Sequence, residues 1–298
     1  MHLPPVQIFW YSLMTTVRTC IALAFMLVAA TRASAHEFWL EPVAPVAVGS
    51  TAHLTLRVGQ FFEGELVGFS TVQTAAIRQY TGTESSNLRA MLPLRNPLAT
   101  LVLPLTNAGT HMVVFDSQPS MISLPAGKFE AYLHDEGLDF ITARRQAAGA
   151  SDSPGRERYR RFVKTLISAV PVSTGAPAAT ASAPDMTYAT RSGQRLEMVP
   201  LADPLLAPVG GALGIRVLFE DKPLVGALLK AWHRHDGQTV MIRAKTSVDG
   251  TASFNLPFSG AWMISVVHMI PATGTQDIEW DSLWGNLSFF VPLAGNKP

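Results

Sequence analysis

Short apolar runs separated by turn-forming residues recur through most of this chain, and they constrain its fold more than any other feature. Residues 51–58 alternate apolar and polar side chains, and the apolar run 101–105 is followed by Asn107-Ala108-Gly109. Runs of this length with glycine, proline and asparagine between them are typical of a β-sandwich or barrel. The sequence therefore predicts an N-terminal, Ig-like β-sandwich domain over residues 36–141, interrupted by a short helical turn at 128–133.

The same pattern returns toward the C-terminus. Apolar runs occupy residues 213–219 and 252–256, and the Asp249-Gly250 pair between them is a typical hairpin turn. The order of these runs and turns resembles a small prealbumin-like β-sandwich. We therefore predict a second, prealbumin-like β-sandwich domain over residues 196–298.

Residues 142–195 break the β pattern. Apolar side chains recur there with the spacing of one helical face, at Tyr159, Phe162, Val163, Leu166 and Ile167. This spacing predicts a connecting helix, and the arginines around it would form its solvated face, with an anion site as the alternative. Residues 171–190 are rich in alanine, proline, serine and threonine, which predicts a flexible linker. The predicted fold is mainly β, with two sandwich domains joined by a helical segment and this linker.

The first 35 residues have the pattern of a secretory signal peptide. Arg18 precedes an apolar run at residues 21–30, and Ala33-Ser34-Ala35 matches the small-x-small cleavage site. A run of about ten residues is shorter than the roughly twenty that a membrane-spanning helix needs. An uncleaved N-terminal anchor is the alternative, and the long first segment leaves Met14 as an alternative start. The sequence therefore predicts export to the periplasm with cleavage after Ala35.

The composition of the predicted mature chain excludes several classes of function. Its only cysteine, Cys20, would be removed with the signal, so disulfides and thiolate metal sites are not expected. Removal of Arg18 and Arg32 leaves 21 basic residues against 22 acidic ones in 263 residues, and no basic stripe suggests a nucleic-acid partner. No second apolar run reaches membrane-spanning length.

Several stretches of the chain together resemble one family. They are residues 35–42, 132–138, 158–166, 196–200, 221–227, 266–269 and 279–284. The set resembles the exported domain-of-unknown-function family 4198, which is often described as a periplasmic component of nickel or cobalt uptake. The resemblance covers nearly all of the mature chain and implies a metal ion and a membrane metal transporter as partners. Some members of the family are fused to a membrane segment, which the mature part of this chain lacks.

Cleavage after Ala35 would make His36 the first residue, and an N-terminal histidine is a ready chelate. Its α-amino group and imidazole Nδ1 bind one metal ion in a single ring, and one further imidazole completes a three-nitrogen histidine brace. Nitrogen ligands without thiolates suit Cu(II) or Ni(II) better than Ca(II) or Mg(II). An α-amino pKa near 8 predicts that affinity falls in acid. The alternative is that His36 is only the first ordered residue of a strand.

His268 and His111 are the candidates to complete this site. His268 lies in the apolar run Val266-Val267-His268-Met269, where burial of a polar side chain costs free energy unless it has a partner. His111 follows Gly109-Thr110. A hydrogen-bonded core histidine is the alternative for both. His134 and His53 are expected to be surface groups.

Two further groups of residues are weaker candidates. His233 and His235 would share one side of a strand just before an Asp236-Gly237 hairpin tip, as a bidentate pair or as plain polar residues. Trp280 and Trp284, with acidic neighbours, could line a pocket, but core packing is the expectation.

The function that these observations favour is capture or delivery of nickel, cobalt or copper in the periplasm, for uptake or homeostasis. One alternative is a copper-dependent oxidative enzyme that uses the same histidine brace. The other is a metal-free module that binds carbohydrate or protein. Nucleophile elbows, phosphate-binding glycine loops and dinucleotide fingerprints are missing, so the sequence does not indicate a particular enzyme.

Overall fold

A computed structural model describes residues 36–171, 184–274 and 277–293 of the chain. The predicted signal peptide and residues 172–183 of the predicted linker lie outside these residues, so both stay predictions. Within the described part, no helix has the length and apolar character that crossing a membrane requires.

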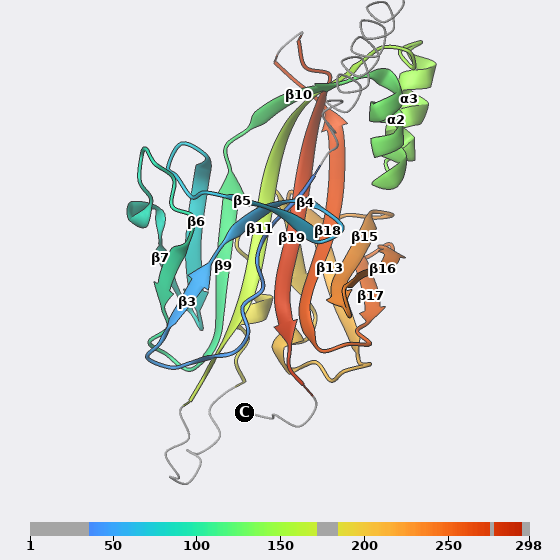
Figure 1. Ribbon diagram of the computed structural model, residues 1–298. Helices are drawn as coiled ribbons and strands as arrows, with labels where there is room; N and C mark the ends of the chain where they lie inside the picture. Colours follow the sequence, from blue (N-terminus) through green and yellow to red (C-terminus); the bar gives the residue numbers. More distant parts are fainter. Residues whose placement is uncertain (1–35, 172–183, 275–276, 294–298) are drawn as a thin grey trace, which may run out of the picture. The chain divides into compact units, whose positions relative to one another are not determined.

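The centre of the fold is a ten-stranded sheet (Figure 1). Its main path runs through β16 (Gln238–Lys245), β15 (Leu228–His235), β18 (Gly260–Pro271), β19 (Trp280–Val291), β11 (Gly155–Val170), β9 (Gly109–Ser117), β6 (Thr74–Thr81) and β7 (Glu84–Asn87). Two short strands, β10 (Ser120–Leu124) and β2 (Val46–Ala47), also pair with β11. β11 and β19 are parallel neighbours, whereas the other pairs along the path are antiparallel.

The predicted connecting helix is wrong, because its residues form β11 in the middle of this sheet. Phe162 and Leu166 point into the core on one face of the sheet, and Val163 and Ile167 point into the core on the other. A strand buried on both faces carries a nearly continuous apolar run, which also satisfies the spacing of one helical face. The helix in this region comes earlier, as α3 (Asp139–Ala147), after α2 (Ala126–Asp135) at the predicted helical turn.

A four-stranded sheet covers one face of the large sheet and gives the fold its β-sandwich character. It consists of β12 (Leu196–Pro200), β13 (Ala212–Phe219), β14 (Lys222–Pro223) and β17 (Thr251–Asn255). The predicted turn at Asp249-Gly250 leads into β17, and Gly250 has a φ of 75° there. The hairpin prediction is wrong, however, because β17 pairs with β13 rather than with the preceding strand.

Two small sheets lie on the opposite face of the large sheet. One contains β1 (Glu37–Leu40), β4 (Leu56–Gln60) and β5 (Glu63–Val67), and the other pairs β3 (Thr51–Leu54) with β8 (Leu101–Pro104). Figure 1 shows β4 and β5 crossing in front of β11, β19 and β18, and β1 contacts β11 and β19. The single strand predicted at residues 51–58 is therefore two strands, which belong to different sheets.

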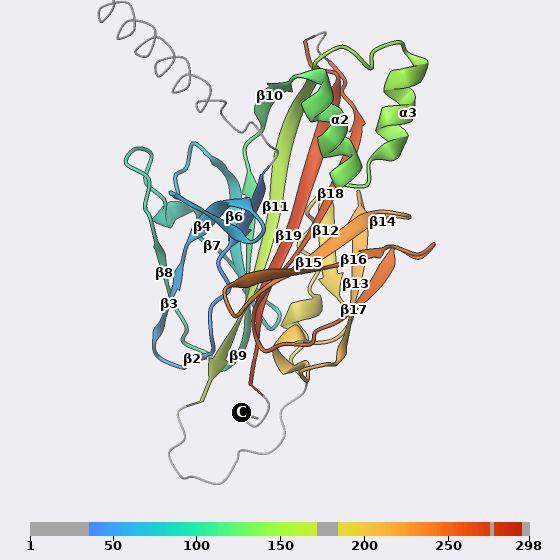
Figure 2. The ribbon, with the colours of Figure 1, turned by 45° about the vertical axis from the view of Figure 1, so that its right-hand side comes forward.

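Short 3₁₀ turns and the two α-helices complete the described elements: η1 (Arg89–Met91), η2 (Thr187–Ala189) and η3 (Pro204–Leu206), with α2 and α3 side by side at one end of the large sheet (Figure 2). The mainly β character is confirmed. Two separate Ig-like domains are not, because the large sheet takes strands from both predicted ranges and the described residues between 36 and 293 belong to one compact unit.

Candidate functional site

Strand β1 fixes the position of His36, the predicted first residue of the mature chain. All four residues of β1 are buried, and Glu37 to Leu40 pair in register with β4. Side chains alternate along the strand, so Phe38 and Leu40 join one apolar cluster and Trp39 joins another. His36 directly precedes this strand and is half-buried.

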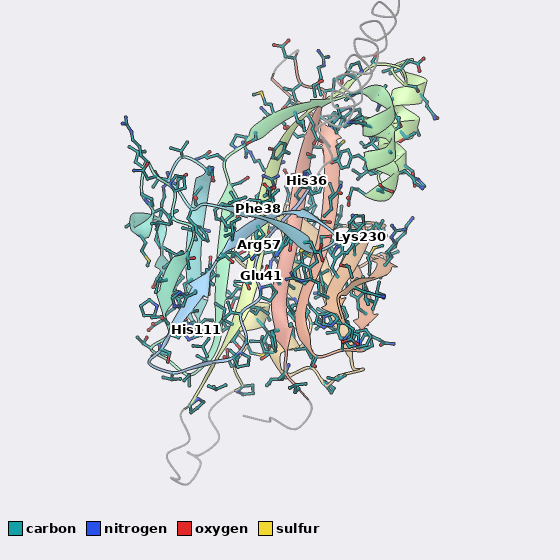
Figure 3. All side chains as sticks on the ribbon, viewed as in Figure 1. His36, Phe38, Glu41, Arg57, His111 and Lys230 are labelled. Atoms are coloured by element: carbon teal, nitrogen blue, oxygen red, sulfur yellow. The ribbon has the colours of Figure 1, made fainter. Side chains whose placement is uncertain are left out.

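Ionic contacts hold the far end of β1. Glu41 pairs with Arg57, with 3.0 Å between Oε2 and Nε, and also with Arg234 of β15. The Trp39 indole N–H donates to the same carboxylate at 3.0 Å. Figure 3 shows Glu41 and Arg57 where the small sheet crosses the large one. Because β1 pairs with β4, packs against β11 and β19, and is held at its end by Glu41, we expect little freedom for the residue that begins it.

The imidazole of His36 lies in a mixed electrostatic environment. Burial lowers its pKa, the nearby Arg161 guanidinium lowers it further, and the Glu65 carboxylate acts in the opposite direction. Glu65 belongs to β5 and pairs with Val58, which in turn pairs with Phe38. His36 precedes Phe38 by two residues and so lies on the same side of the small sheet as Glu65. The ring is therefore neutral at neutral pH, which is the state that binds metals.

A buried charge cluster formed by Glu37, Glu136 and Lys230 lies on the other side of β1. The Lys230 ammonium of β15 is 2.6 Å from the Glu136 carboxylate, just beyond the end of α2, and 3.5 Å from the Glu37 carboxylate. The three residues are 5–6% exposed, so the charges have lost most of their hydration. Figure 3 shows Lys230 beside the end of the crossing strands.

A serine in the middle of an apolar strand orients this cluster. The Ser265 hydroxyl of β18 donates to Glu37 Oε1 at 2.7 Å and accepts the Trp232 indole N–H at 3.0 Å. The hydroxyl thus donates one hydrogen bond and accepts another, and Glu37, the second residue of the predicted mature chain, is held from both β15 and β18.

Another buried carboxyl group, that of Glu157, lies under α2. Glu157 of β11 is 2% exposed and accepts the Tyr132 hydroxyl at 3.3 Å. The Tyr132 ring stacks on Trp284, with ring centroids 5.6 Å apart and an angle of 7° between the planes. Trp284 donates from its indole N–H to Ser282 at 3.3 Å. The Trp280–Trp284 segment therefore packs in the core, as expected, with Trp284 against the helix.

Both buried carboxyl groups bind protons more tightly than an exposed glutamate. Burial raises the pKa of Glu157 to about 7, against hydrogen bonds from Ser282 and Tyr132 and the charge of Arg161. Burial likewise raises the pKa of Glu136 to about 7, opposed mainly by Lys230. Perturbed groups of this kind concentrate at functional sites, although structural ion pairs show the same shifts. Here the contacts lead from α2 to β1, so the cluster positions the N-terminal strand.

His111 is not close to His36. It lies on β9, and both of its ring nitrogens have partners: Nδ1 is 2.8 Å from Gln79 Nε2, and Nε2 is 2.8 Å from the Asn107 carbonyl oxygen. Figure 3 shows His36 and His111 in separate parts of the molecule. The geometry is that of the hydrogen-bonded core histidine named as the alternative.

His268 lies on the opposite face of the large sheet from β1. Its neighbours Val266 and Ile264, at alternate positions of β18, belong to the core under the four-stranded sheet. The ring packs on Phe219, with centroids 4.6 Å apart, and burial lowers its pKa to about 4. The structure thus brings none of the predicted metal ligands together.

The weaker histidine pair has the predicted arrangement. His233 and His235 share one side of β15, with ring centroids 5.9 Å apart. His233 is buried against Trp262 and its Nδ1 is 2.7 Å from the Ala261 carbonyl oxygen, so only its Nε2 is left for a ligand. Among the described residues no group of three or more histidine, cysteine or acidic side chains could hold a metal ion.

Sequence reasoning missed the buried charge cluster, although a signal was present. Lys230 interrupts the apolar run of β15, and Ser265 interrupts that of β18. The same argument that singled out His268 applies to both. It would have pointed to the face of the sheet that β1 covers.

Comparison with known proteins gives a family and little else. No curated protein matches the chain. One solved structure, three N-terminal domains of the bacteriophage RB49 Highly Immunogenic Outer Capsid protein, covers 86% of this chain and 71% of its own at 8% identity. Its TM-score of 0.17 is too low to carry an argument about the fold. A family model described as "Domain of unknown function (DUF4198)" matches residues 33–270, which include Glu37, Glu136, Glu157 and Lys230. The chain therefore belongs to the DUF4198 family.

Proposed function

We propose that this protein is exported, is cleaved after Ala35, and binds a divalent transition metal ion through its new N-terminal residue, His36. The observation that carries the proposal is the fixation of β1. Four consecutive buried residues and the Glu37–Ser265 hydrogen bond hold the strand directly after His36. A chelate on a fixed residue loses less conformational entropy on binding than one on a loose terminus.

The electrostatic environment of His36 supports a carboxylate, rather than a second histidine, as the next metal ligand. Its lowered pKa keeps the imidazole free of a proton, and Glu65 offers a carboxylate on the same side of the small sheet. His36 would supply the amine and imidazole nitrogens, and Glu65 would supply an oxygen in place of a second histidine. The negative charge of Glu65 also offsets the repulsion between a cation and Arg161.

A ligand set of two nitrogens and one oxygen suits Ni(II), Co(II) or Cu(II), in keeping with the metals first expected. Capture would be followed by release to a membrane metal transporter. Both nitrogens must lose their protons before they bind the ion, so affinity falls as the pH decreases. This release in acid needs no conformational change.

The first measurement is mass spectrometry of the secreted protein, which identifies its N-terminal residue. The second is calorimetric titration of that protein with Ni(II), Co(II) and Cu(II). His36→Ala and Glu65→Gln should each weaken binding by about 10-fold or more. His53→Ala, which changes an exposed histidine on β3, is the matched control and should bind as the wild type does.

One further variant isolates the α-amino group. A glycine inserted between Ala35 and His36 keeps the imidazole but moves the free amine to a different residue. This insertion should weaken metal binding and leave the unfolding of the protein unchanged. A secreted chain that begins at another residue, or a His36→Ala protein that binds all three metals as well as the wild type, would rule the proposal out.

A further inference from the structure

A pocket of about 420 Å³ opens beside β1, where the small sheet meets β9, β10 and β11. Phe38, Val58, Val67 and Phe115 form apolar walls on one part of the pocket. The rest is lined by polar side chains, which are Arg161, Tyr159, Gln73, Ser117, Gln118 and Ser120. This volume lies within the range of small-molecule sites, which combine mostly apolar walls with a few polar groups.

The guanidinium of Arg161 is the charged group of this pocket. It contacts two rings, with its Cζ 4.5 Å from the centroid of Phe38 and 4.7 Å from that of Tyr159. The backbone N–H of the same residue donates to Ser117 at 2.9 Å, which fixes the base of the side chain. Tyr159 also hydrogen-bonds the guanidinium, so the remaining N–H donors are the part that a ligand can contact.

This guanidinium lacks the anionic partner that other arginines of the fold have. Arg158, on the same strand, binds Asp281 with contacts of 2.6 and 2.8 Å, and Arg145 binds Glu130 at 2.8 Å. In the described part of the chain, none of the ion pairs involves Arg161, and its buried Nε has no hydrogen-bond partner. The half-buried guanidinium therefore has no carboxylate of the described residues in direct contact, and an anionic ligand could form the ion pair that it lacks.

We infer that this pocket binds a small organic monocarboxylate, with the carboxylate on the edge of Arg161 and the apolar body against Phe38, Val58 and Phe115. Guanidinium and carboxylate match in a two-point contact. The apolar walls favour a ligand with a hydrocarbon body over a bare inorganic anion, because burial of that body adds to affinity.

The charges behind Arg161 favour a ligand with a single negative charge. The carboxyl groups of Glu157 and Glu37 act on the same guanidinium and would repel a second negative charge. Phosphate is largely dianionic at neutral pH, whereas Arg161 is the one cation among the described residues that line the pocket. The inference does not rest on metal binding, because neither the pocket nor Arg161 requires an ion at His36.

The test compares benzoate with its neutral counterpart benzamide, by calorimetry and by NMR titration of the mature protein at pH 7.5 without added metal. The two probes have nearly the same shape and differ in charge. We expect saturable binding of benzoate at least 10-fold tighter than that of benzamide. Arg161→Gln should weaken benzoate binding about 30-fold and bring it close to that of benzamide. Arg160→Gln, which changes the neighbouring arginine on the opposite face of β11, should bind as the wild type does.

Three results would overturn the inference. The first is that none of acetate, benzoate and octanoate binds. The second is equal binding of benzoate and benzamide, and the third is unchanged binding of benzoate by Arg161→Gln. Phosphate that binds while the carboxylates do not would also overturn it, in favour of an inorganic anion. The comparison of benzoate with benzamide uses the wild-type protein, so it decides the matter even where Arg161→Gln does not fold.

Discussion

Replacement of Glu157 by glutamine tests whether the fold holds a protonated carboxyl group at neutral pH. The side chain is 2% exposed, and burial raises its pKa from the usual 4.5 to about 7. Between these two pH values the folded protein retains a proton that the unfolded chain has released. Stability therefore falls as the pH rises through this window and is level above it. A shift of about 2.5 pKa units, at about 1.4 kcal/mol per unit, corresponds to about 3 kcal/mol.

Glutamine has nearly the shape of the protonated acid and does not ionise. Glu157→Gln should therefore have nearly the wild-type stability at pH 4.5 and exceed it by up to about 3 kcal/mol at pH 8. Urea unfolding of the mature chain at half-unit steps from pH 4.5 to 8.5 measures the difference directly. Glu84→Gln, at an exposed position of β7, is the matched control. A difference between Glu157→Gln and wild type that does not change with pH would refute the reasoning.

Three other substitutions examine the contacts around β1 and the opposite face of the sheet. Lys230→Met leaves two carboxyl groups without their cation and should lower the free energy of unfolding by about 3–5 kcal/mol at pH 8, in the same urea assay. Part of this loss should be recovered at pH 5.5, because Glu136 then takes up a proton. Ser265→Ala removes the partner of the Trp232 indole and should cost about 1–3 kcal/mol by thermal unfolding. Gly250→Ala forces a side chain into a φ of 75° and should cost more than about 1 kcal/mol, measured by calorimetry, while Gly226→Ala tests the same φ without a close neighbour.

Local patterns in the sequence predict most of the strands, because a half-buried strand leaves a period of two and its turns require particular residues. The Asp236-Gly237 tip joins β15 and β16 with positive φ at both residues, as its composition predicts. Local patterns do not predict β11 as a strand, and the reason is physical. Both faces of that strand are buried, so its period of two disappears. Its pairing with β9 and with β19, which is more than 100 residues away, shows that it is a strand.

The site was predictable only in part. His36 stands out from the cleavage pattern, but the ligands expected beside it depended on tertiary contacts that spacing does not reveal. His268 lies on the far face of the sheet, and both ring nitrogens of His111 have hydrogen-bond partners. The carboxylate of Glu65 comes near His36 through the register of β1, β4 and β5, which no local pattern encodes.

The two sides of the large sheet offer a way to separate stability from function. Lys230 contacts β1 through Glu37, whereas Gly250 lies at a turn of the four-stranded sheet on the opposite face. If the charge cluster serves to fix His36, Lys230→Met weakens metal binding beyond what its loss of stability explains, and Gly250→Ala does not. Metal affinity measured well below the unfolding temperature makes this comparison, because the folded fraction of both variants is then close to one. Equal affinities in the two variants would mean that the cluster contributes to the fold alone, and that His36 owes its position to the apolar residues of β1.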